Sequence, residues 1–259
     1  MSQESLTVKR LDRYFHYVHK SDYVFEGHRH YHYELNVILS GEMEVTCDEN
    51  VYRLRANDLI LIPPYVFHRN RVTSESEAEM IVVQFSTDTD RGDLPRVVTM
   101  TERERAVFEL FIRDTEQICR FEAGQYLTQS TTAEKLFSVF VAYTDRCNSE
   151  TPVLSDGRSA IYRQAVRYML AHLTESLRMD DVARECKVCR TTLKKVFAHY
   201  TGCGCMEFFS ELKLDRAKRM LNEGASCGEI ARALGYASQA HFTKRFKEHY
   251  GILPSKIKG

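Results

Sequence analysis

The chain has 259 residues, of which 43% are hydrophobic, and its 36 Lys and Arg balance 36 Asp and Glu to a formal net charge of zero. This is ordinary globular composition, long enough for one large domain or two smaller ones, and no run approaches the roughly 18 apolar residues of a membrane helix. The start lacks the apolar segment of a signal peptide, and eight cysteines are too few for a disulfide scaffold, so we expect a cytoplasmic protein with reduced thiols and no membrane partner.

The first ninety residues have the pattern of a β domain. Five short runs alternate between apolar and polar residues, with turn-rich spacers between them: Glu34–Ser40, Met43–Cys47, Val51–Arg55, Leu59–Ile62 and Met80–Phe85. Because no helical period separates these runs, they predict an antiparallel barrel or sandwich.

Histidines gather at the start of this β domain. The spacing His28-x-His30-x3-Glu34-x6-Gly41, followed by Pro63, Pro64 and His68, resembles the two motifs of the cupin barrel. Alternate residues of a strand share a face, so His28, His30, His32 and Glu34 are predicted to lie together, with Tyr31 and Tyr33 opposite. The second motif is incomplete, because Tyr65 stands where a glycine is expected and no asparagine follows His68 at the usual distance.

Three interpretations of this histidine pattern stay open. The first is an effector pocket formed by His28, His30, His32, Glu34 and His68, in which His, Glu and Tyr suit a hydroxyl-rich ligand. The second is a metal site of three histidines and one carboxylate, His28, His30, His68 and Glu34, which is what the resemblance to metal-binding cupins implies. The third is that nothing binds there.

Two amphipathic helices are predicted after the β domain. Thr101 and Glu104 form a capping-box pattern, and Val107, Leu110, Phe111 and Ile118 follow at helical spacing. A second helix, about Ala133–Cys147, carries Leu136, Phe137, Phe140, Val141 and Tyr143. These helices are interpreted either as a packing layer or as a surface for homodimer formation, and we favour the dimer.

The last hundred residues are helical and contain two similar segments about fifty residues apart. The sequence Asp181–Val182–Ala183–Arg184 is echoed by Glu229–Ile230–Ala231–Arg232, and His199–Tyr200–Thr201–Gly202 by His249–Tyr250–Gly251. Residues 156–259 hold 19 Lys and Arg against 11 Asp and Glu, a balance of +8, whereas residues 1–155 have a balance of −8. A charge asymmetry of this kind indicates that the basic half binds a polyanion. The alternative is that the two domains simply differ in surface charge.

The second repeat has the pattern of a helix-turn-helix. Ser226 with Glu229 caps a short helix, and Gly235 permits the left-handed turn that ends it. Ser238 then caps a helix predicted at Gln239–Tyr250. An ordinary helical hairpin has the same core spacing, but the repetition and the local positive charge favour a unit that enters a major groove.

This part of the chain resembles the AraC/XylS family of transcription regulators. The matching residues are Glu229–Ile230–Ala231, Leu234–Gly235–Tyr236, Phe242, Phe246–Lys247, Gly251 and Pro254, and upstream Leu193, Phe197, Thr201–Gly202, Leu212–Lys213–Leu214, Ala217 and Met220–Leu221. The resemblance implies two recognition helices, joined by a long helix, in successive major grooves roughly 34 Å apart. It also implies a small-molecule effector, frequently a sugar.

Ten residues are expected to contact DNA if the resemblance is carried over position by position. They are Arg190, Thr191, Thr192, Lys194 and Lys195 in the first recognition helix, and Gln239, Ala240, His241, Lys244 and Lys247 in the second. Gln can pair with adenine and Lys can donate to guanine. The sequence departs from the family at Lys195, Lys213 and Lys244, where arginine is usual, and at Cys189, which replaces a serine cap.

Four cysteines lie close together in the first repeat: Cys186, Cys189, Cys203 and Cys205. Their spacing admits a zinc or thiol-sensing interpretation. Three of them, Cys186, Cys203 and Cys205, occupy positions that the family fills with apolar core residues, so we favour packing.

Together these patterns predict an α+β protein in three parts: a cupin-like sensing domain at 1–98, a helical dimerisation or linker region at 99–155, and a double helix-turn-helix domain at 156–259. We expect a non-enzymatic regulator that binds double-stranded DNA and is controlled by a small-molecule effector. It is also expected to form a homodimer and can contact RNA polymerase. The favoured interpretation includes no cofactor. The rivals are a regulator without an effector and a metal-dependent cupin enzyme. Effector, operator and sign of regulation stay open.

Overall fold

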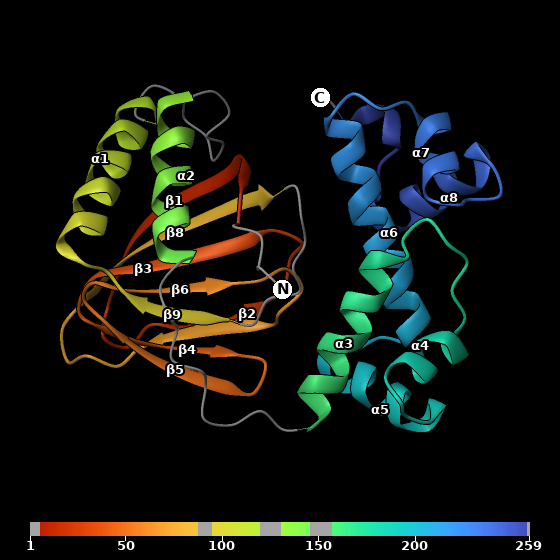
Figure 1. Cartoon of the computed structure of the whole chain (residues 1–259), viewed down its shortest axis with the longest axis horizontal. Coiled ribbons are helices and arrows are strands. Elements are labelled where there is room, and N and C mark those ends of the chain that lie inside the picture. The colour runs from red at the N-terminus through yellow and green to blue at the C-terminus, as the bar shows by residue number, and fades with distance from the viewer. Residues whose placement is uncertain (1–5, 88–94, 120–130, 146–156, 258–259) are drawn as a thin grey trace. The chain divides into compact units, whose positions relative to one another are not determined.

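The structure, a computed structural model, describes residues 6–87, 95–119, 131–145 and 157–257 (Figure 1). The chain divides into two compact units, Met1–Ser155 and Asp156–Gly259. Among the described residues, no helix is both long enough and apolar enough to cross a membrane.

The N-terminal unit is built on antiparallel β-strands. Its described residues form β1 (Val8–His19), β2 (Val24–His28), β3 (Tyr33–Ser40), β4 (Glu42–Cys47), β5 (Asn50–Arg55), β6 (Asp58–Ile62), β7 (His68–Val72), β8 (Ala78–Thr87) and β9 (Arg96–Thr99). They pair into two sheets with the orders β1-β8-β3-β6-β9 and β2-β7-β4-β5. The predicted antiparallel β fold is confirmed.

The five predicted runs correspond to β3, β4, β5, β6 and β8, each within two residues at either end. The prediction missed β1, β2, β7 and β9. Strand β1 lies at the edge of its sheet, and its exposed and half-buried residues follow no strict alternation, so its sequence has no clear period of two. In β7, arginine and histidine or asparagine alternate, so a polarity pattern gives no signal.

The space between the two sheets changes from polar to apolar along the strands. Its apolar part is a core of Ile38, Met43, Val45, Ile60, Val72, Met80 and Val82, among others. On β3, Asn36 and Glu34 lie on the same face as Ile38, toward the start of the strand. On β7, Asn70 and His68 lie on the same face as Val72, also toward the start of the strand. The polar side chains from both sheets therefore share one end of the barrel interior.

Helices α1 (Glu102–Cys119) and α2 (Thr131–Asp145) lie side by side and cover the other face of the first sheet (Figure 1). Their Phe111 and Phe137 are fully buried in a core shared with Leu35 and Val37 of β3. This packing layer was one of the two interpretations of the helices.

The capping box that starts α1 is confirmed, since Thr101 N donates to Glu104 Oε2 at 2.7 Å and Glu104 N to Thr101 Oγ1 at 3.4 Å. Leu110, one of the apolar residues at helical spacing, is not part of this core and is 49% exposed. Helix α2 begins two residues earlier than predicted, and Cys147 lies outside the described residues, as do the side chains of Ile118 and Tyr143.

The C-terminal unit is helical. Its described elements are α3 (Gly157–Ala171), α4 (Met179–Glu185), α5 (Arg190–Thr201), α6 (Cys205–Asn222), α7 (Cys227–Ala233), α8 (Gln239–Tyr250) and a 3-10 turn η1 (Pro254–Lys256). The pairs α4–α5 and α7–α8 are the two predicted helix-turn-helix copies, and α6 joins them. Helix α8 has the predicted bounds.

In the second helix-turn-helix copy, the structure confirms the predicted helix caps and the predicted glycine turn. The Ser226 hydroxyl accepts from Glu229 N, and the Ser238 hydroxyl accepts from His241 N at 3.1 Å. Gly235 has a φ of 66°, in the left-handed region that glycine adopts without strain. Cys189 stands at the N-cap of α5 and makes no side-chain capping hydrogen bond, as the departure from the family pattern implied.

Candidate functional site

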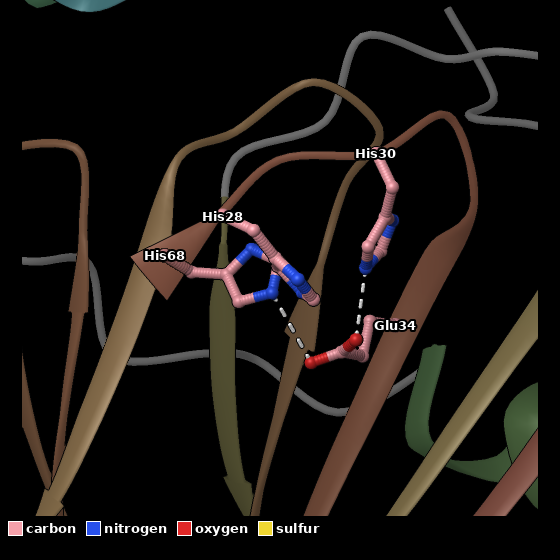
Figure 2. Close-up of side chains that lie close together, drawn as sticks. All are labelled: His28, His30, Glu34 and His68. Carbon is pink, nitrogen blue, oxygen red and sulfur yellow. Dashed lines mark hydrogen bonds and ion pairs between the residues drawn. The ribbon is translucent and has the colours of Figure 1, made fainter. Parts of the chain in front are cut away.

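Four polar side chains converge at one end of the barrel interior (Figure 2). His28 ends β2, His30 lies in the segment between β2 and β3, Glu34 is in β3, and His68 begins β7. One ligand atom from each lies within 4.8 Å of those of the others. We call these four residues the histidine cluster. Among the described residues it is the only such group of histidine, cysteine and acidic side chains.

Glu34 is the centre of the cluster. His30 Nε2 lies 2.9 Å from Glu34 Oε2, and His68 Nε2 lies 3.3 Å from Glu34 Oε1 (Figure 2). Gln84 of β8 donates from Nε2 to Glu34 Oε2 at 2.9 Å. His68 Nδ1 donates to the carbonyl of Val66 at 3.0 Å, which orients that ring toward the carboxylate. The carboxylate is thus held by partners from three other segments.

Burial and charge set the protonation of the cluster. Burial alone would raise the pKa of Glu34, but the imidazoles of His68 and His30 outweigh it and hold that pKa well below its usual range. Burial would lower the pKa of His68, and the Glu34 carboxylate reverses this and raises it. The pKa of His28 falls to about 4 through burial and the nearby His68 and His30. At neutral pH, Glu34 is therefore ionised, while His28 is neutral and has a free lone pair.

The structure separates His32 from this cluster. The prediction assumed one continuous strand through residues 28–34, but residues 29–32 lie between β2 and β3, so strict alternation does not apply to them. His32 is buried, and its Nδ1 lies 2.9 Å from Asp12 Oδ2 of β1. Tyr33 does face away from Glu34, into the core beneath α1 and α2, as alternation within β3 requires.

The departure from the cupin pattern at Tyr65 has a visible backbone consequence. Tyr65 has a φ of 63°, a left-handed conformation that favours glycine, and its N–H donates to the carbonyl of His30 at 2.8 Å. Tyrosine thus occupies the expected glycine conformation without loss of the turn. The bond to His30 ties this turn to the cluster.

Sequence reasoning missed three polar residues beside the cluster. Gln84 was detectable, because it lies on the inward face of a predicted strand after Met80 and Val82. Asn36 is fully buried, and neither atom of its amide has a hydrogen-bond partner within the described part of the chain; the same holds for the Oδ1 atom of Asn70. Buried amides without partners cost stability unless a ligand or water satisfies them.

The two candidate DNA-reading helices carry their predicted residues on the outside. In α5, Thr191, Lys194 and Lys195 are exposed and Thr192 is half-buried; in α8, Gln239, Ala240, His241, Lys244 and Lys247 are exposed. The opposite faces pack inward through Leu193 and Phe197 in α5 and Phe242 and Phe246 in α8.

The cations of these helices differ in how they are paired. The Arg190 guanidinium forms two hydrogen bonds to the Asp180 carboxylate of α4, so its charge is already neutralised. Lys244 Nζ lies 4.0 Å from Glu248 Oε1, at the limit of an ion pair. Lys194, Lys195 and Lys247 have no ion-pair partner among the described residues.

The cysteines of the first helix-turn-helix do not assemble a metal site. Cys186 and Cys205 are buried, Cys203 is half-buried and Cys189 is exposed. Over the described residues, these thiols form no group whose sulfur atoms lie close enough together to hold a metal ion. Burial raises the pKa of Cys186 to about 11 and of Cys205 to about 12, which is typical of inert packing thiols.

Comparison with known proteins agrees with this architecture. Residues 182–259 match a helix-turn-helix domain family and residues 15–84 a cupin domain family. The HTH-type transcriptional regulator GbdR of Pseudomonas aeruginosa is 32% identical over 93 residues, 36% of this chain but only 25% of GbdR. The Msm operon regulatory protein of Streptococcus mutans is 23% identical over 240 residues, 87% of this chain and 84% of that protein.

One of the similar proteins is a solved structure. The AraC-type transcriptional regulator from Chromobacterium violaceum is 31% identical, with 39% of this chain and 92% of that chain covered and a TM-score of 0.38. The chain belongs to the AraC/XylS family. Its AraC-type DNA-binding domain is the C-terminal unit, and its cupin domain carries the histidine cluster.

Proposed function

We propose that this AraC/XylS-family chain is a sequence-specific transcription regulator that reads two successive major grooves of double-stranded DNA. The observation that carries the proposal is the duplicated helix-turn-helix, in which α5 and α8 each turn an apolar face inward and an exposed polar face outward. Gln239 and Lys244 on α8 have the donors and acceptors that read base edges, and the unpaired lysines suit phosphates.

The experiment is selection of DNA from a random library by the full chain, followed by affinity measurement on the selected duplex. Replacing Gln239 and Lys244 together with alanine is expected to weaken binding to that duplex far more than binding to unrelated DNA, because base contacts carry specificity. Lys20→Ala, which removes an exposed charge from the N-terminal unit, is the control. Unchanged affinity of the double variant for the selected duplex would contradict the assignment.

We further propose that a small molecule bound at the histidine cluster controls DNA binding by favouring the DNA-competent arrangement of the protein. The support is the cluster together with Asn36 and Asn70, which line the same interior with unsatisfied hydrogen-bonding atoms. A panel of sugars, acids and amines in thermal-shift and DNA-affinity assays tests this. A responsive compound should lose its effect in Glu34→Gln but not in His249→Gln, whose exposed imidazole lies on α8. A panel without any response would count against the effector.

A divalent metal ion is a second candidate occupant, favoured by the spacing of the four ligand atoms within 4.8 Å. Three imidazoles and one carboxylate fit such an ion by donor type, and His28 has its lone pair free at neutral pH. When bound, the metal would act as a Lewis acid or as a structural tie between β2, β3 and β7. Metal content after dialysis against Zn²⁺ or Co²⁺ tests this, with loss of binding expected in His28→Ala and retention in His249→Ala.

We also propose that the chain forms a homodimer through α1 and α2. Their outward faces leave Leu110 and Val139 about half exposed, at 49% and 45%. Sedimentation velocity is expected to show dimers for the native chain and a shift to monomers for Leu110→Lys with Val139→Lys. Lys135→Glu, an exposed change on α2 that removes no apolar group, serves as a control. A native monomer would refute the proposal.

A further inference from the structure

A lysine is buried in the middle of the C-terminal unit. Lys213 lies near the centre of α6, the helix that joins the two helix-turn-helix copies, and only 9% of its surface is exposed. Lysine is among the residues least often buried, because its ammonium must be kept hydrogen-bonded when water is removed. The surroundings of Lys213 therefore need to supply acceptors.

Those acceptors are backbone carbonyls and not carboxylates. Lys213 Nζ donates to the carbonyl of Glu175 at 2.7 Å and to the carbonyl of Leu234 at 2.9 Å. It also lies 5.0 Å from the centre of the Phe209 ring. Within the described residues no acidic side chain forms an ion pair with it. Burial lowers the pKa of the Lys213 ammonium, and the two carbonyls supply the compensation.

The two carbonyls belong to different halves of the DNA-binding domain. Glu175 lies in the segment between α3 and α4 that leads into the first helix-turn-helix, and Leu234 is the C-cap of α7, at the turn of the second. Unpaired carbonyls at the end of a helix carry partial negative charge, which attracts a cation. The ammonium thus bonds both halves from the helix that joins them.

A direct backbone contact lies beside this ammonium. A Cβ atom added to Gly235 would lie 2.6 Å from the carbonyl oxygen of Thr174 and 3.9 Å from Lys213 Nζ. The turn of the second copy therefore touches the segment before the first copy so closely that no side chain fits. We call Thr174, Glu175, Lys213, Leu234 and Gly235 the joint.

We propose that Lys213 is a positioning residue that fixes the relative placement of α5 and α8, and thereby the spacing of the two DNA half-sites that the protein accepts. The inference rests on the proposed DNA-binding function. Two modules held in one geometry bind a correctly spaced double site far more tightly than either half-site. Modules that pivot about α6 would lose that advantage and tolerate other spacings, although each recognition helix would be unchanged.

The test compares Lys213→Met with the native chain on three kinds of DNA: the selected double site, each half-site alone, and double sites with base pairs inserted or removed between the halves. Methionine keeps the length and apolar stem of lysine but removes the donor. We expect affinity for the double site to fall about tenfold and the dependence on spacing to flatten, with half-site affinity nearly unchanged. Lys213→Arg, which can donate to both carbonyls, is expected to restore the native spacing profile.

Lys218→Met is the matched control, since it removes the same charge from α6 but its Nζ lies over the Tyr250 ring, away from the joint. A Lys213→Met protein with the native spacing profile would overturn the inference, as would equal losses on half-sites and double sites, which indicate general destabilisation. If the native chain selects no DNA sequence, the proposed function and the inference fail together. If it selects a double site that Lys213→Met reads normally, only the inference fails.

Discussion

The pairing of cations on α5 leads to a quantitative prediction. Lys194 and Arg190 are both exposed at the start of this helix, but Arg190 is already bonded to Asp180, whereas Lys194 has no ion-pair partner among the described residues. We therefore expect Lys194→Ala to remove a phosphate contact. Arg190→Ala should change the salt dependence of DNA binding much less, because it removes a charge that is neutralised before DNA arrives.

The magnitude follows from counterion release. Each neutralised phosphate contributes about −0.9 to the slope of log affinity against log salt, so a fourfold rise in salt lowers affinity about 3.5-fold per contact. If Lys194, Lys195 and Lys247 each bind one phosphate, together they contribute about −2.7 to the slope. Lys194→Ala should make the slope less negative by about 0.9, and Arg190→Ala by clearly less.

Fluorescence anisotropy on the selected duplex at several KCl concentrations measures this slope. Lys20→Ala removes one exposed positive charge from the acidic N-terminal unit, and we expect it to leave the slope unchanged. Equal slope changes for Lys194→Ala and Arg190→Ala would refute the reasoning from pairing. If neither variant changed the slope, that result would show that α5 is not part of the DNA interface.

Three further predictions concern stability. Ser226→Ala, which removes the cap of α7, should lower the free energy of unfolding by about 1 kcal/mol in urea titrations. Cys189→Ser should raise it by about 0.5–1 kcal/mol, because the Cys189 side chain at the N-cap of α5 makes no capping hydrogen bond. His16 lies 2.8 Å from Glu79 and 2.6 Å from Glu116; burial lowers its pKa, but the two carboxylates outweigh burial and raise it. Stability from His16 is therefore present below pH 6.5 and lost as pH rises through the raised pKa, so His16→Gln should lower the melting temperature more at pH 6 than at pH 9.

Each stability prediction has its own control. Ser76→Ala, an exposed change between β7 and β8 and outside any helix cap, is the control for Ser226→Ala and is expected to have no matching effect. A Cys189→Ala variant distinguishes the gain of a serine cap from the loss of a thiol, and an equal gain in both would contradict the capping argument. A pH-independent effect of His16→Gln would show that the bonds to Glu79 and Glu116 do not depend on the charge of the imidazole.

The histidine cluster illustrates how far spacing alone can predict a site. His28, His30, Glu34 and His68 were all expected, because cupin-like spacing identifies them, and the structure brings them together. His32 fits the same alternation but bonds to Asp12 instead, since the chain leaves the strand between residues 29 and 32. A pattern with period two is informative only where the backbone is extended throughout.

Local interactions are what the sequence by itself determined about this protein. Each helix cap and each turn depends on residues a few positions apart, so these features can be predicted before any fold is known. They include the Ser226 and Ser238 caps, the glycine turn at Gly235 and the duplicated helix pair. Tertiary structure alone decided that Arg190 is neutralised by Asp180, that Gln84 reaches Glu34, and that Lys213 bonds both halves of the DNA-binding domain. These contacts join segments 10 to 50 residues apart, and their formation depends on how helices and sheets pack.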